Sequence, residues 1–218
     1  MRQTFTDYRL FAQEFLRTFH TTGAILPSSP ALAKALTRHV ARHPADGRPR
    51  SILEVGPGTG AVTRYLVERL APHDHVTLVE LNERFVERLR QRFESDPRFR
   101  PARRRVTIVH DRLEALSPEA PYDLIVSGLP LNNFAAADVK SILAIYRQLL
   151  APGGTLSFFE YMAVRPIRSR ISGADERVRI REIDRMISEL LRDHRVRRDG
   201  VWTNVPPAWA QHVQFSSG

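Results

Sequence analysis

Ile52-Leu53-Glu54-Val55-Gly56-Pro57-Gly58-Thr59-Gly60 is the stretch that decides the fold of this chain. A short apolar run ends in an acid and passes into closely spaced glycines, which is typical of the first strand and first turn of a nucleoside-binding α/β sheet. Glycine is required where the backbone takes a positive φ or lies against a ligand. The pattern therefore predicts a strand, a ligand-binding turn and a helix over residues 61–70 whose first N–H groups face the ligand.

Glu54 distinguishes between two possible ligands of this turn. The spacing of Gly56, Gly58 and Ala61 also satisfies the dinucleotide fingerprint G-x-G-x-x-G/A. A dinucleotide would place its pyrophosphate at the helix N-terminus, where the carboxylate of Glu54 would repel it. S-adenosylmethionine has no phosphate there and carries an amino group and a sulfonium, which a carboxylate attracts. Glu54 thus favours a methyl donor over a dinucleotide.

Composition limits the partners and the compartment. The net charge is +9, and nearly all of the excess is arginine, since lysine occurs only at Lys34 and Lys140. Nucleic acid and anionic lipid headgroups both suit such a chain. The absence of cysteine excludes disulfides and thiolate zinc sites and is compatible with a reducing cytosol. No signal peptide is evident, and the longest apolar run, residues 156–164, is too short to span a membrane, so any membrane contact is expected to be peripheral.

The length of 218 residues favours a single domain, with residues 1–50 as an N-terminal helical cap and residues 51–218 as the core. Residues 4–20 predict an amphipathic helix with an aromatic face and a basic face. It could anchor the chain at a membrane interface or pack on the core, and the pattern alone favours packing. A second helix is expected from Pro30 to Arg42, with Ser29 as its N-cap.

From residue 51 onwards strands and helices alternate, which predicts a doubly wound, mostly parallel sheet. After the first strand, further strands are expected at residues 76–80, 106–109, 122–126 and 155–161, with helices over 82–93, 138–150 and 182–194. Two closing strands, residues 197–204 and 208–215, would add an antiparallel edge. The arginine-rich section 165–181 is expected to be partly mobile.

The ends of these strands supply the other candidate donor contacts. Glu80 follows Gly60 by twenty residues, the position at which a carboxylate accepts both ribose hydroxyls. Asp111, after the third strand, is a candidate acceptor for the adenine amino group. The loop from Ser127 to Phe134 follows the fourth strand and should border the transferred methyl group. The full set of predicted donor contacts is Glu54, Gly56, Gly58, Gly60, Glu80, Leu81, Asp111, Arg112, Ser127, Gly128 and Leu129.

Taken together, these features resemble a class I S-adenosylmethionine-dependent methyltransferase with a seven-stranded Rossmann-like sheet. Three segments are similar to the bacterial phospholipid N-methyltransferases: Phe15-Leu16-Arg17 with residues 22–29, Ser127-Gly128-Leu129-Pro130-Leu131-Asn132-Asn133-Phe134, and Asn204-Val205-Pro206-Pro207-Ala208. That family methylates the amine of phosphatidylethanolamine towards phosphatidylcholine, with S-adenosylhomocysteine as second product. One departure is Glu160, where the family often has a hydroxyl residue before the tyrosine.

The resemblance implies a cytoplasmic enzyme bound peripherally to the inner face of the cytoplasmic membrane. The N-terminal helix would bind the anionic lipid surface of this membrane. The residues that would make the contact are Phe5, Tyr8, Arg9, Phe15 and Phe19. Arg165, Arg168 and Arg170 would bind the substrate phosphate. Glu160 or Tyr161 would receive the ammonium proton, and Tyr161 and Phe134 would hold the methylated ammonium by cation–π contact, with core packing as the alternative for both rings. No metal is expected.

Two rival functions stay open at this point. A nucleic-acid amino-methyltransferase would suit the basic charge, but such enzymes usually carry an Asn/Asp-Pro-Pro-Tyr-like loop after the fourth strand. Residues 128–131 here read Gly-Leu-Pro-Leu, so we do not expect nucleic acid as the acceptor. A membrane-binding protein with an inactive or secondary methyltransferase domain is the other rival.

Overall fold

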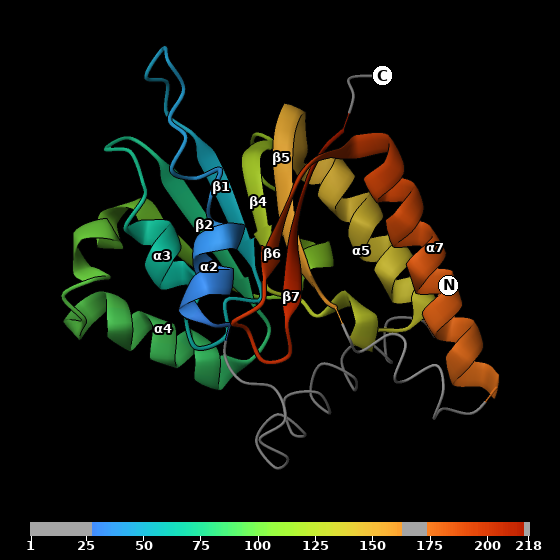
Figure 1. Cartoon of the computed structure of the whole chain (residues 1–218). Helices are drawn as coiled ribbons and strands as arrows, with labels where there is room; N and C mark the ends of the chain where they lie inside the picture. Colours follow the sequence, from blue (N-terminus) through green and yellow to red (C-terminus); the bar gives the residue numbers. More distant parts are fainter. Residues whose placement is uncertain (1–27, 163–173, 216–218) are drawn as a thin grey trace.

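Seven strands form one sheet in the order β3-β2-β1-β4-β5-β7-β6 (Figure 1). The structure is a computed structural model and describes residues 28–162 and 174–215. Strands β1 to β5 run parallel, whereas β7 is antiparallel to both β5 and β6. The prediction of a doubly wound, mostly parallel sheet is thereby confirmed. The strands are β1 (Ser51–Val55), β2 (His75–Glu80), β3 (Val106–His110), β4 (Tyr122–Ser127), β5 (Leu150–Tyr161), β6 (Arg195–Val201) and β7 (Ala208–Gln214).

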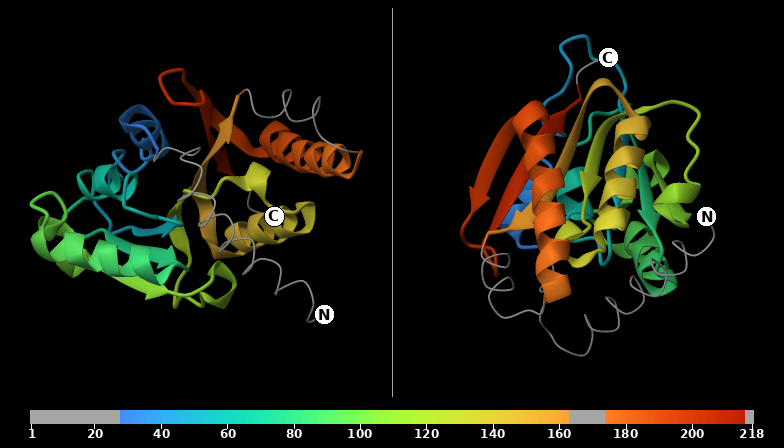
Figure 2. Two further views of the ribbon diagram at one scale, coloured as in Figure 1. Left: turned by 90° about the horizontal axis from the view of Figure 1, so that it is seen from below. Right: turned by 90° about the vertical axis from the view of Figure 1, so that its right-hand side faces the viewer.

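Helices cover both faces of the sheet (Figure 2). One face packs against α2 (Pro30–Leu36), α3 (Thr63–Val67) and α4 (Glu83–Ser95), and the other against α5 (Ala136–Leu149) and α7 (Ala174–His194). Short 3-10 turns lie at η1 (Arg100–Arg105), η2 (Leu113–Ala115) and η3 (Leu131–Asn133). Successive strand residues point to opposite faces, so the core forms two apolar clusters. None of the described helices is long and apolar enough to cross a membrane.

The carboxyl ends of β1 to β5 share one edge of the sheet, which we call the carboxyl edge (bottom in Figure 1). Val55 pairs with both Val79 and Ser127, so the residues that follow these three strands come together there. Because Tyr161 pairs with Ala208 across the antiparallel β5–β7 ladder, the turn between β6 and β7 lies at the same edge. The candidate site residues that follow these strands therefore lie together at the carboxyl edge.

The N-cap of the second predicted helix is confirmed, since the Ser29 hydroxyl accepts the N–H of Leu32 at 3.2 Å. That helix is shorter than predicted: it ends at Leu36, with Thr37 as its C-cap, and the following residues form turns. The helix predicted over 61–70 is likewise reduced to α3, since Gly60 and its neighbours form turns.

Further boundaries differ at the C-terminal half of the chain. Strand β5 begins at Leu150 and β6 covers Arg195–Val201, each earlier than predicted. Helix α7 begins at Ala174, eight residues before the helix predicted over 182–194, and thus includes part of the arginine-rich section. One reason is that Arg179 donates from Nη1 to the carbonyls of Asn132 and Phe134, which fastens this part of α7 to the loop after β4.

At the opposite edge, Arg50 joins the cap to the sheet. Its guanidinium is 4% exposed and pairs with the fully buried Asp74, the Nε to Oδ1 distance being 3.1 Å. The remaining N–H groups donate to the carbonyls of His39, Val40 and Arg42. Burial alone would raise the pKa of Asp74, but the Arg50 guanidinium and two backbone N–H groups hold it below its ordinary value.

Candidate donor and acceptor site

Glu54 is the central acid of the candidate site. It lies on β1 on the face covered by α3, is 1% exposed, and neither carboxylate oxygen has a hydrogen-bond partner within the described residues. Burial raises the pKa of Glu54 to about 8, and the negative charge of the Glu80 carboxylate also raises it. The nearby Thr63 lowers this pKa, although it forms no well-aligned hydrogen bond with Glu54. A buried acid without a partner is costly, so the site fits a ligand that brings a cationic donor group.

Glu80 orders the glycine turn. Its Oε2 accepts the Gly58 N–H and its Oε1 accepts the Asn82 N–H, both at 2.9 Å. Burial raises the pKa of Glu80, and these backbone N–H groups act in the opposite direction. Each carboxylate oxygen has a second lone pair, so the predicted bonds to ribose hydroxyls are compatible with this arrangement.

Gly56 and Gly58 have different structural roles in the turn. At Gly56 (φ 68°) an added Cβ would lie 2.7 Å from the Leu129 side chain, so this glycine allows the loop after β4 to approach β1. At Gly58 (φ 56°) an added Cβ would meet no atom within 4 Å, so the backbone there borders open space. The open space beside Gly58 is compatible with the predicted nucleoside ligand.

The loop after β4 is fixed against the glycine turn. The Gly128 N–H donates to the Val55 carbonyl at 2.8 Å, and a Cβ at Gly128 would lie 2.6 Å from the Gly56 carbonyl oxygen. Ser127 is fully buried, and its hydroxyl bonds to the Tyr146 hydroxyl of α5 at 2.8 Å. The side chain of Ser127 thus holds the loop on α5, and a direct donor contact would have to come from its backbone or from Leu129.

The end of β3 completes this edge. Asp111 is exposed, and its Oδ1 accepts the Arg112 N–H at 2.7 Å, so the acid is oriented by its own turn. The ring of His110 lies 3.2 Å from the Leu81 carbonyl and links the ends of β2 and β3. Nothing in the sequence indicates which carbonyl of the neighbouring strand lies beside His110, so this contact could not be predicted.

The candidate acceptor residues lie on different faces of the sheet. Glu160 is buried on the α5 and α7 side, where its Oε2 accepts the Gln211 amide at 2.8 Å. Tyr161 lies on the α2 side, with its ring edge-on to Phe159 at 5.2 Å between centroids. Burial raises the pKa of Tyr161, which keeps the phenol protonated at neutral pH. Since successive strand residues alternate, Glu160 and Tyr161 do not act side by side.

The other predicted acceptor contacts divide into two groups. Phe134 is buried in the apolar cluster with Leu131, so its ring packs in the core and a contact with substrate stays a prediction. Two predicted sets lie outside the described residues: the phosphate-binding Arg165, Arg168 and Arg170, and the membrane contacts Phe5, Tyr8, Arg9, Phe15 and Phe19. Within the described residues, no group of three or more His, Asp or Glu side chains is placed to hold a metal ion.

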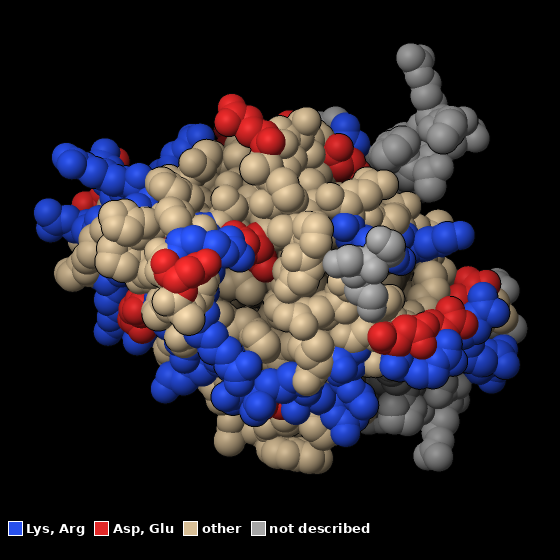
Figure 3. Space-filling model, turned by 90° about the horizontal axis from the view of Figure 1, so that it is seen from above, with Lys and Arg blue, Asp and Glu red and all other residues tan. Residues whose placement is uncertain are grey.

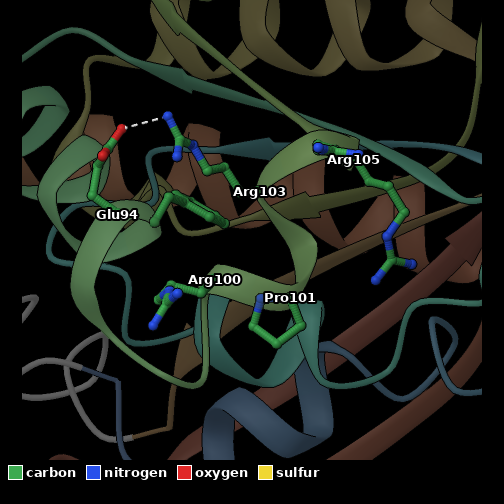
Figure 4. A pocket seen from close by; sticks show the side chains of 7 residues that line it. Glu94, Arg100, Pro101, Arg103 and Arg105 are labelled. Atoms are coloured by element: carbon green, nitrogen blue, oxygen red, sulfur yellow. Dashed lines mark ion pairs between the residues drawn. The ribbon is translucent and has the colours of Figure 1, made fainter.

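Arginines also gather away from the candidate site. A hollow of about 500 Å³ beside η1 is lined by Arg100, Arg103 and Arg105, with Glu94 paired to Arg103 at 2.9 Å (Figure 4). Because η1 leads into the start of β3, this hollow is remote from the carboxyl edge. Basic side chains likewise spread over the face seen from above, opposite the carboxyl edge (Figure 3). Positive charge alone therefore does not mark the functional edge.

The open side of Gly58 leads to a direct test. Gly58→Ala should weaken binding of S-adenosylmethionine, the ligand expected here, by about tenfold or more, because the new methyl group would occupy the ligand's space. The matched control is Gly47→Ala, since Gly47 also has a positive φ (67°) and nothing within 4 Å of an added Cβ. Both variants carry the same backbone strain. Equal donor affinity in the two variants, measured by calorimetry, would contradict this placement.

Comparison with known proteins supports the methyltransferase fold. Residues 52–154 match the family model described as a methyltransferase domain. An O-methyltransferase from Bacillus cereus, solved in complex with S-adenosylhomocysteine, superposes with a TM-score of 0.63 at 19% identity over 94% of this chain and 90% of that one. At this identity the likeness concerns the fold.

Two curated proteins are similar to this chain in sequence. The ornithine lipid N-methyltransferase of Singulisphaera acidiphila is 29% identical over 151 residues, which is 69% of this chain and 76% of the relative. The ribosomal RNA small subunit methyltransferase A of Brucella canis is 40% identical over 101 residues, but the match covers only 44% of this chain and 34% of that relative.

The segment matched by the family model contains the glycine turn and all three acids of the predicted donor site, Glu54, Glu80 and Asp111. Solved relatives of the same fold carry S-adenosylhomocysteine, the product of the donor predicted from Glu54. The part of this chain that holds the predicted donor site, residues 52–154, is a methyltransferase domain, and the cofactor that its relatives support is S-adenosylmethionine.

Proposed function

We propose that the enzyme N-methylates the headgroup amine of phosphatidylethanolamine, towards phosphatidylcholine, at a membrane surface. The observation that carries this proposal is the similarity to ornithine lipid N-methyltransferase, because it extends over most of both chains. The name of that relative gives a lipid as acceptor and nitrogen as the methylated atom. The excess of arginine supports an anionic membrane as partner. In this proposal the enzyme is cytoplasmic and bound peripherally to the inner face of the cytoplasmic membrane.

The transfer is an in-line displacement. The donor supplies a methyl group on a sulfonium; the neutral amine forms the new C–N bond, and the C–S electron pair stays on sulfur. The protein has to align the two reactants and supply a deprotonated amine. Glu54 and Glu80 fix the donor side. On the acceptor side, Tyr161 is the candidate cation–π contact for the ammonium and, like Glu160, a candidate proton acceptor; because the two side chains face opposite sides of the sheet, only one of them would act on the amine.

RNA is the second candidate acceptor, since one relative acts on ribosomal RNA by its name and is 40% identical over the matched part. Two observations make RNA the weaker choice. The match covers a third of that relative. The loop after β4 offers Leu129, Pro130 and Leu131, of which the last two are buried, where a base-clamping loop has a polar acceptor and an aromatic ring.

One assay compares these acceptors. Purified enzyme with labelled S-adenosylmethionine is given vesicles of phosphatidylglycerol alone, the same vesicles with phosphatidylethanolamine, vesicles with ornithine lipid, or ribosomal RNA. We expect label only where an amine-bearing lipid is present, and most with phosphatidylethanolamine. Label confined to ornithine lipid would correct the headgroup, and label confined to RNA would refute the proposal. Vesicle binding without transfer to any acceptor would identify a membrane protein with an inactive domain.

A further inference from the structure

The turn that joins β6 to β7 is the most apolar exposed feature of the described chain. Trp202 is 70% exposed and Val205 is 67% exposed. The other large apolar side chains that are exposed in the described residues, Val178 and Val196, reach only 48% and 49%. Single exposed apolar residues are common, but two within four positions on one turn form a local apolar tip.

This tip lies at the carboxyl edge. Ala208, which follows the turn, pairs with Tyr161, and the Met162 N–H donates to the Pro207 carbonyl at 2.8 Å. The tip thus borders the strand end that carries the candidate acceptor residues (Figure 1). Val196 lies at the other end of β6, because the neighbouring Arg195 pairs with Val213, near the end of β7.

The turn is held in place from within. Asn204 is 4% exposed, its Oδ1 accepts the Ser29 N–H at 3.1 Å, and its amide donates to the Pro206 carbonyl at 2.7 Å. The side chains on either side of Asn204 are exposed while Asn204 itself is fastened to the start of α2. Trp202 and Val205 are therefore presented outwards by a fixed backbone, which lowers the entropy cost of their burial against a partner.

A basic groove adjoins the tip. It has a volume of about 690 Å³, lies between α2 and β6, and is lined by Lys34, Arg38, Arg42, Arg69, Asp199 and Trp202. Four cations against one acid make this surface positive. Tryptophan beside cations is the combination found at membrane interfaces, where the ring enters the interfacial layer and the cations meet anionic headgroups.

We propose that the β6–β7 turn is a membrane contact of this enzyme, which inserts Trp202 and Val205 into the interfacial layer of an anionic bilayer while the basic groove faces the headgroups. This inference deepens the proposed function and rests on it, because it explains how the acceptor side of the site would be held at the surface. A lipid surface fits better than a single-stranded nucleic acid, since Val205 offers no stacking face for a base.

Fluorescence tests the insertion of Trp202 directly. The chain has two tryptophans, Trp202 and Trp209. In the variant Trp209→Phe only Trp202 emits, and its emission should shift to the blue and be quenched by brominated lipid on addition of phosphatidylglycerol–phosphatidylethanolamine vesicles. In Trp202→Phe the remaining Trp209, whose ring packs against residue 202 with 5.8 Å between the ring centroids in the wild type, should shift less to the blue, because its side chain is already partly buried. If the protein sediments with the vesicles but the emission of Trp202 does not change, the inference is wrong. A blue shift of Trp202 on addition of RNA without vesicles would also overturn it.

Vesicle binding gives the energetic test. Trp202→Ser should weaken binding to these vesicles by roughly tenfold, and Val205→Ser by somewhat less, in proportion to the apolar area that no longer inserts. Val196→Ser is the matched control, because it removes an exposed valine at the opposite end of β6. Its effect should stay below about twofold. Thermal unfolding of each variant shows that it folds, and equal binding by Val205→Ser and Val196→Ser would count against the proposal.

The same samples distinguish this inference from the proposed function. Methylation of phosphatidylethanolamine without any response of Trp202 would leave the function standing and refute the turn as a contact. A response of Trp202 with no methylation of any lipid would leave the contact standing and refute the function.

Discussion

Glu54→Gln should bind S-adenosylmethionine about a hundredfold more weakly than the wild-type enzyme, because a buried carboxylate would no longer meet the cationic amino group of the donor. The substitution keeps the shape of the side chain, which is 1% exposed, and removes only its ability to ionise. Calorimetric titration measures the affinity. Glu87→Gln, which changes an exposed carboxyl on α4, is the control and should bind normally.

Glu54 also gives the enzyme a defined pH dependence without donor. Burial raises its pKa to about 8, well above the ordinary value for glutamate. Between these two pKa values the unfolded chain holds fewer protons than the folded one, so this residue's contribution to stability is lost as pH rises from about 4.5 to about 8. Wild-type enzyme should therefore lose stability relative to Glu54→Gln between pH 5 and pH 9.

Thermal unfolding of both proteins at these two pH values checks the sign. Donor binding should reverse the effect, because a cationic ligand favours the ionised carboxylate and lowers its pKa. A constant difference in melting temperature between the two proteins across this range would show that Glu54 ionises normally.

Asp74→Ala should lower the free energy of unfolding by about 3–5 kcal/mol, since it leaves the buried guanidinium of Arg50 without its counter-ion. The loss is large because both partners are buried, at 4% and 0% exposure. Removal of Asp74 also deprives the N–H groups of Ala71 and Arg50 of their acceptor. Urea unfolding at neutral pH measures the change.

The control for Asp74 is Glu94→Ala, which breaks the exposed ion pair with Arg103 at 2.9 Å and should cost less than about 1 kcal/mol. The pH dependence is opposite to that of Glu54. Because the pKa of Asp74 is lowered, its contribution should hold at neutral pH and be lost as pH falls through that lowered pKa. If Asp74→Ala and Glu94→Ala lower the free energy of unfolding by similar amounts, the buried Arg50 does not depend on Asp74 as its counter-ion.

Sequence reasoning succeeded where local patterns carry the information. The apolar run before Gly56 forms β1, and the acids Glu54 and Glu80 end up on adjacent strands at one edge. Ser29 and Pro30 mark the start of α2 because an N-cap is decided within four residues. Helix α7 was partly missed, because a dense run of charges is also typical of a mobile, solvated segment.

The long-range partners could not be predicted. Asp74 and Arg50 are 24 positions apart, and Asn204 and Ser29 are 175 apart, so no local period links them. The same limit applies at the acceptor side. The alternation of a strand shows that Glu160 and Tyr161 face opposite ways, but only the packing of β7 shows that Gln211 binds Glu160.

The hydrogen bond between Ser29 and Asn204 joins nearly the two ends of the described chain. Helix α2 packs on β6 and β7, and Arg38 pairs with Asp199 at 2.8 Å. During synthesis, which proceeds from the N-terminus, α2 is made first but its binding surface is made last. Helix α2 can therefore complete its contacts only once the closing strands β6 and β7 have been synthesised.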